Sequence, residues 1–79
     1  MQGGDTIRRV DLTGRKWPVP VIEVAKIMKK AQPGERVEVV IDDLQSLEDL
    51  RKWSSRTRNK IVSEERVGST WRIVIEKGG

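Results

Sequence analysis

The chain has 79 residues, a length that accommodates one domain. Lysine and arginine number 16 against 12 aspartate and glutamate, and the resulting net charge of +4 mildly favours anionic partners. The sequence contains no cysteine and no histidine. This excludes disulfides, thiolate catalysis, Cys/His zinc sites and imidazole acid–base chemistry. We therefore expect a protein that is not an enzyme and has no catalytic residues, metal site or cofactor.

Hydropathy argues against a membrane protein. Hydrophobic residues make up 35% of the chain, and the longest apolar or proline run, residues 17–22, is far shorter than the ~20 residues that span a bilayer. The sequence does not begin with a short basic segment followed by an apolar stretch. We therefore predict no secretory signal and a cytoplasmic location. The 35% charged content is also typical of thermophile proteins. We expect one domain over residues 1–79, with residues 1–5 and 78–79 flexible.

The first half of the chain predicts a strand followed by a helix. Residues 6–12 are strand-like, with apolar side chains among charges. Pro18 and Pro20 are tolerated only in the first turn of a helix, so a helix should begin near Pro18 and cover residues 18–31. Its apolar side chains share one broad arc, except for Ile22, which falls on the polar side.

The second half predicts another strand and another helix before the closing strands. Residues 35–42 alternate apolar and polar, as a half-buried strand does. A helix fits residues 45–57, with Asp43 as its N-cap and Asn59 as a left-handed stop. We expect the neighbouring carboxylates of Asp42 and Asp43 to diverge, which leaves capping as the explanation of Asp43.

Two closing strands, residues 60–67 and 70–77, complete a β-α-β-α-β-β order. This order predicts parallel pairing across the helices and an antiparallel final hairpin. Two helices cannot cover both faces of four strands. We therefore predict an α+β fold, a two-layer α/β sandwich with a four-stranded mixed sheet and both helices on one face. The predicted bare face carries Val40, Val62 and Val74 among Glu38, Glu64, Arg66, Arg72 and Glu76. Three valines among charges offer little apolar surface for dimerisation, so we expect a monomer or weak dimer.

Residues 11–20, D-L-T-G-R-K-W-P-V-P, carry a family motif. The segment resembles the TusA/SirA-like small sulfur carriers, whose signature is Asp-x-x-Gly-x-x-Cys-Pro-x-Pro at the entrance to the first helix. Pro33-Gly34, the Asp42-Asp43 pair and the closing hairpin extend the resemblance over about residues 10–77. It implies the sandwich fold predicted above and a site at the start of the first helix.

The resemblance places Trp17 where the family has its reactive cysteine. That cysteine accepts sulfur as a persulfide and passes it to a partner, and a helix N-terminus lowers its thiol pKa. Indole cannot form a persulfide, and the chain has no other cysteine. The resemblance thus implies a family domain that cannot carry sulfur and that serves as a protein-binding or regulatory module, with a sulfur-relay protein as its partner.

The candidate partner-binding residues surround this motif. Trp17 has two interpretations: its ring docks a partner or stacks on a base, or it folds over the core edge and plugs the old site. A third possibility is that Trp17 was introduced into a working carrier or is specific to this copy, which the gene's own codon would show. The full set comprises Asp11, Gly14, Arg15, Lys16, Trp17, Pro18, Pro20 and Ile22, of which the aspartate, the glycine and the prolines also suit a turn and a helix start.

Residues 51–60 suggest an alternative function. The stretch holds five basic residues and no acid: Arg51, Lys52, Arg56, Arg58 and Lys60. Such a cluster can neutralise phosphates, so a small basic domain that binds nucleic acid, RNA in particular, is the alternative. Cations at the end of a helix also complement its dipole, and this second explanation stays open. Trp53, the one aromatic residue in the stretch, suits the core better than a stacking platform.

Overall fold

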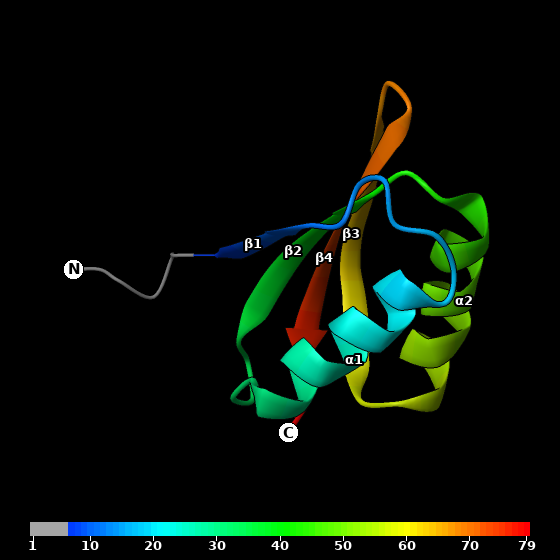
Figure 1. Cartoon of the computed structure of the whole chain (residues 1–79). Coiled ribbons are helices and arrows are strands. Elements are labelled where there is room, and N and C mark those ends of the chain that lie inside the picture. The colour runs from blue at the N-terminus through cyan, green and yellow to red at the C-terminus, as the bar shows by residue number, and fades with distance from the viewer. Residues whose placement is uncertain (1–6) are drawn as a thin grey trace.

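The computed structural model describes residues 7–79 and contains the six elements in the predicted order. The predicted flexible leader, residues 1–5, lies outside the described residues. Both helices lie on the same face of the sheet (Figure 1), and no helix in residues 7–79 is long and apolar enough to span a membrane. The elements are β1 (Arg8–Asp11), α1 (Val19–Lys30), β2 (Arg36–Ile41), α2 (Leu44–Arg56), β3 (Asn59–Val67) and β4 (Thr70–Lys77).

The sheet is mixed, with the strand order β1-β2-β4-β3. β1 runs parallel to β2, whereas β4 is antiparallel to both β2 and β3. This confirms the predicted α+β sandwich. The parallel pairing matters for the site, because it brings the carboxyl ends of β1 and β2 to the same edge of the sheet.

The core lies between the sheet and the two helices. Alternation along β2 places every second side chain on this inner face, where the three apolar residues are fully buried. α1 and α2 cover them with apolar side chains spaced one helical turn apart. The buried hydrophobic residues are Leu12, Val24, Met28, Val37, Val39, Ile41, Leu47, Leu50, Ile73 and Ile75.

A bulge in β3 changes which side chains face the helices. Ile61 pairs with Ile75, but the next paired residue, Ser63, lies opposite Val74, so β3 contains one residue more than β4 over this stretch. Because side chains alternate between faces, one extra residue exchanges the two faces for the rest of the strand.

The placement of Glu64 and Arg66 on the bare face is therefore wrong. Glu64 lies opposite Ile73, which is fully buried under the helices, and it accepts a hydrogen bond of 3.0 Å from Arg51 Nε on α2. Arg66 lies opposite Trp71, with its guanidinium carbon 5.3 Å from the centre of the indole ring. The bulge breaks the simple alternation on which that prediction rested.

The end of α2 also differs from the prediction. Asp43 caps the start of the helix as expected, accepting from the Ser46 backbone N–H at 3.1 Å. Asn59, however, is not a left-handed stop, because it already belongs to β3 and no residue other than glycine in 7–79 has a positive φ. The chain becomes extended at Thr57, with φ −126°, and its hydroxyl accepts from Asn59 Nδ2 at 3.1 Å. These side-chain hydrogen bonds replace the expected glycine-like turn.

The carboxyl-terminal glycines contact the segment between α2 and β3. The Arg58 guanidinium donates to the Gly79 carbonyl at 2.5 Å. A Cβ atom at Gly78 would overlap the Arg58 carbonyl oxygen. Gly78 and Gly79 thus lie beside Arg58.

Candidate functional site

The motif loop, residues 12–18, connects β1 to α1 and begins with a tight turn. The Asp11 carboxylate accepts hydrogen bonds from Thr13, at 3.0 Å from the backbone N–H and 2.7 Å from the hydroxyl. These bonds, the hydroxyl first, lower the pKa of Asp11. Gly14 then adopts φ +81°, a conformation that side chains resist. Asp11 and Gly14 thus shape the loop locally.

Two carboxylates from the end of β2 hold the motif loop in place. Asp42 accepts from the Gly14 backbone N–H at 2.9 and 3.1 Å. Asp43 accepts from the Trp17 backbone N–H at 3.0 Å while it caps α2. The expectation that these two side chains diverge is wrong, because β1 and β2 end at the same edge and both carboxylates meet the loop there.

Asp43 joins the motif loop to α2 through one oxygen atom. Its Oδ2 accepts from the Trp17 backbone N–H and from the Ser46 hydroxyl, the latter at 2.7 Å. The Ser46 hydroxyl is the largest cause of the lowered pKa of Asp43, with smaller contributions from the backbone bonds and the Lys16 charge. Capping was predictable from sequence, whereas the bond to the loop depends on the packing of β1 beside β2.

The loop delivers Trp17 to the mouth of α1. Pro18 occupies the N-cap position, and Pro20 is buried in the first turn. The Val19 backbone N–H donates to the Lys16 carbonyl at 2.9 Å, and that of Ile22 donates to the Pro18 carbonyl at 3.1 Å. Both prolines therefore start the helix as predicted from their fixed φ.

The indole of Trp17 lies outside the hydrophobic core and is 45% exposed. Its Nε1–H donates to Asp49 Oδ2 at 2.9 Å. Trp53 and Trp71, by contrast, pack against the core. The ring of Trp17 is thus positioned by a surface hydrogen bond rather than by burial in the core.

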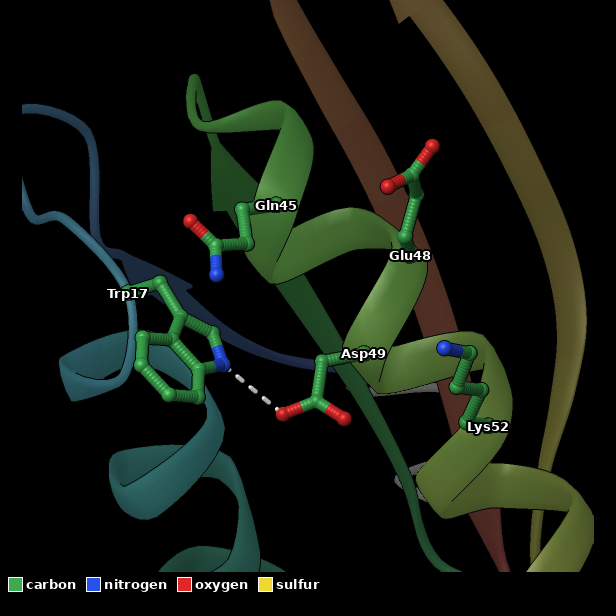
Figure 2. Close-up of a pocket in the computed structure, with 5 residues that line it drawn as sticks. All are labelled: Trp17, Gln45, Glu48, Asp49 and Lys52. Atoms are coloured by element: carbon green, nitrogen blue, oxygen red, sulfur yellow. Dashed lines mark hydrogen bonds between the residues drawn. The ribbon is translucent and has the colours of Figure 1, made fainter.

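A pocket lies between this indole and one face of α2. We call it the Trp17 pocket. Figure 2 shows Gln45 and Asp49 on the side of α2 close to the ring, and Glu48 and Lys52 on the same helix but farther from the ring. The four α2 residues are spaced three, four and seven positions from the first, which places them on one helical face. The lining residues are Trp17, Gln45, Glu48, Asp49 and Lys52. The spacing was visible in the sequence, but the position of Trp17 opposite it was not.

Apolar side chains are exposed around the same helix mouth. Val19 is 37% and Ile22 47% exposed in the first turn of α1, and Leu44 is 55% exposed at the start of α2. Arg15 and Lys16 are exposed in the motif loop. The predicted site residues thus lie on one continuous segment, to which the fold adds Asp42, Asp43 and the α2 face of the Trp17 pocket.

The basic stretch is partly neutralised by acids from elsewhere in the fold. Arg51 pairs with Glu64, which raises the pKa of the guanidinium and lowers that of the carboxyl. Arg56 lies 4.0 Å from Asp49. Lys52 belongs to the Trp17 pocket, so the basic stretch and the motif meet there. Arg58 contacts the carboxyl-terminal glycine, and Lys60 is exposed.

Comparison with known proteins matches this fold and motif to one family. The family model described as Sulfurtransferase TusA matches residues 8–77. The chain belongs to the TusA family. A candidate sulfur carrier protein of Archaeoglobus fulgidus is 34% identical over 68 residues, covering 86% of this chain and 93% of the relative. One of Methanocaldococcus jannaschii is 34% identical over 71 residues, covering 90% and 95%.

A solved structure supports the fold of this TusA-family chain. The crystal structure of a SirA-like protein from Desulfitobacterium hafniense superposes with a TM-score of 0.77 at 23% identity. The match covers 92% of this chain and all of that one. Without any cysteine, the chain has no thiol on which a persulfide could form. Residues 7–79 also contain no cluster of three or more potential metal-ligating side chains.

Proposed function

We propose that this TusA-family chain is a protein-binding module that engages a sulfur-relay protein without carrying sulfur. The observation that supports this most is the exposed indole of Trp17 at the helix mouth, where the motif of related carriers has its cysteine. A tryptophan that is anchored at one atom and otherwise open suits a contact residue, because its large amphipathic ring contributes strongly to interfaces.

The apolar side chains beside Trp17 support a contact surface. Val19 and Ile22 are exposed on the first turn of α1, although both could have been polar without harm to the core. Burying such side chains stabilises a complex in proportion to the apolar area removed from water. We therefore assign the contact surface to Trp17, Val19 and Ile22, with Arg15 and Lys16 at its edge.

The motif loop is preorganised for binding. Asp42 and Asp43 hold its backbone, and Asp49 holds the indole. A surface that is already ordered loses less conformational entropy when a partner docks. The chain would thus occupy a partner's carrier-binding surface but accept nothing from it, and so regulate sulfur transfer by competition with carriers that have a cysteine.

The test is titration of the isotopically labelled chain with sulfur-relay proteins, followed by backbone amide shifts. We expect the largest shifts in residues 14–23. Ile22→Ala should weaken binding, whereas Val67→Ala, which truncates a similarly exposed aliphatic side chain in the β3–β4 hairpin, should not. If residues 14–23 move with none of the proteins tested, the proposal fails.

A further inference from the structure

We propose that the Trp17 pocket receives an arginine side chain of the partner, with the guanidinium stacked on the indole and paired with the carboxylates of Glu48 and Asp49. This inference rests on the proposed function, because the pocket adjoins the assigned contact surface. It adds the chemistry that the partner must present. The observation that most supports this proposal is that the exposed ring of Trp17 lies opposite a polar face of α2.

The ring supplies one wall of the pocket. The bond from Nε1 to Asp49 Oδ2 fixes the indole beside α2 and leaves 45% of the residue exposed. An indole attracts a cation over its face through its quadrupole, and a planar guanidinium also stacks on it. The same chain already contains such a pair, with Arg66 over Trp71.

The charges of the pocket favour a cation. Among the lining residues, two carboxylates, Glu48 and Asp49, stand against one ammonium, Lys52, although the Arg51 guanidinium is close enough to Glu48 to feel its charge. Within residues 7–79, Glu48 and Lys52 form no ion pair, and Asp49 reaches Arg56 only at 4.0 Å. The Glu48 carboxylate therefore has acceptor sites available for an incoming donor. The lining residues by themselves carry a net negative charge, opposite in sign to that of the whole chain.

Arginine suits this pocket better than lysine. Its guanidinium offers several donors in one plane, so it can stack on the ring and still pair with a carboxylate at its edge. A lysine ammonium is a compact, strongly hydrated charge and cannot do both. A phosphate or an acidic side chain would be repelled by the two carboxylates of the pocket, and its single lysine could not offset both. We therefore commit to an arginine-bearing segment of a protein.

The experiment uses the full chain with short capped peptides, which differ only in a central arginine, lysine, citrulline or glutamate. The readout is the Trp17 Nε1–H resonance together with the amides of residues 45–52. We expect a saturable shift with the arginine peptide, a weaker one with lysine, and none with citrulline, which has the same shape without charge. An equal shift with citrulline, or a preference for glutamate, would overturn the inference.

Two variants test the sign of the interaction. Glu48→Gln should weaken binding of the arginine peptide by about threefold, and Lys52→Gln should strengthen it by a similar factor. Both side chains are exposed, so neither variant should unfold the protein. Glu65→Gln and Lys60→Gln make the same charge changes on β3 and should leave the affinity unchanged. Stronger binding by Glu48→Gln together with weaker binding by Lys52→Gln would overturn the proposal.

These results are separable from the proposed function. If a sulfur-relay protein shifts residues 14–23 equally in the wild type, Glu48→Gln and Lys52→Gln, the arginine contact is excluded while the binding module stands. If the arginine peptide binds but no sulfur-relay protein does, the pocket chemistry stands and the partner assignment fails.

Discussion

The indole Nε1–H of Trp17 donates a 2.9 Å hydrogen bond to Asp49, a residue 32 positions further along the chain. The bond joins the motif loop to α2 across the helix mouth. A second bond, from the Trp17 backbone N–H to Asp43, joins the same two segments at 3.0 Å. The backbone and the indole of Trp17 are thus each held by an aspartate from the segment after β2. The ring is ordered although it is not buried.

Trp17→Phe should test whether the ring is held by this bond. The change keeps an aromatic ring but removes the N–H, and we expect the free energy of unfolding to fall by at most about 1 kcal/mol, because the lost bond is exposed. Urea unfolding followed by far-ultraviolet circular dichroism measures it. Asp49→Asn keeps an acceptor and should cost less. A loss above about 3 kcal/mol would indicate a core residue instead.

Asp43→Ala should destabilise the protein by about 1–2 kcal/mol, because it removes the N-cap of α2 as well as the acceptor for the loop. The same urea measurement applies, and amide shifts should report disturbance at both Ser46 and Trp17. Asp43→Asn is the matched control, since asparagine also caps helices. Equal losses in the two variants would show that the charge, rather than the acceptor, holds the two segments.

Acid should weaken this junction. The pKa values of Asp11 and Asp43 are lowered in the folded state by their hydrogen bonds. A carboxyl with a lowered pKa contributes stability that is complete above its unfolded value, near pH 4, and is lost as pH falls through the folded value. Unfolding free energies measured between neutral pH and about pH 2 should therefore fall less steeply for Asp43→Asn than for the wild type. Parallel curves would contradict this.

Trp17→Cys should allow the chain to accept sulfur if the scaffold is intact. The new thiol would stand at the N-terminus of α1, where the helix dipole favours the thiolate that attacks sulfane sulfur. Incubation with polysulfide, followed by mass spectrometry, should show a gain of one sulfur atom. Val67→Cys places a thiol at a similarly exposed position on the hairpin and should load more slowly. Equal loading rates would show that the helix mouth contributes nothing.

Nucleic-acid binding should be undetectable even at low salt. Arg51 is paired with Glu64 and Arg56 lies near Asp49, so the basic stretch presents less free charge than its sequence indicates. We expect no binding to single-stranded RNA or DNA at ~50 mM salt by fluorescence anisotropy. Affinity that falls steeply with salt and disappears in an Arg58→Ala/Lys60→Ala variant would instead support the alternative function.

Local sequence was enough to predict the fold and part of the site. Pro18 and Pro20 restrict the backbone wherever they stand, so the start of α1 could be located to about one residue. Gly14 and the Asp43 cap likewise depend on neighbours within a few residues. The lack of a thiol is a matter of composition and needs no structure.

The remaining features depend on contacts between segments that are distant in the chain. The β3 bulge turned Glu64 toward Arg51, and only the pairing of β3 with β4 decides where such an extra residue falls. The attachment of Asp42 to Gly14, and of Trp17 to Asp49, required β1, β2 and α2 to be packed together. Sequence determined which conformations and which chemistry each segment can adopt, because steric limits and side-chain composition are local. Tertiary structure decided which side chains meet, because hydrogen bonds across 28 and 32 residues form only after the strands pair and α2 packs on them.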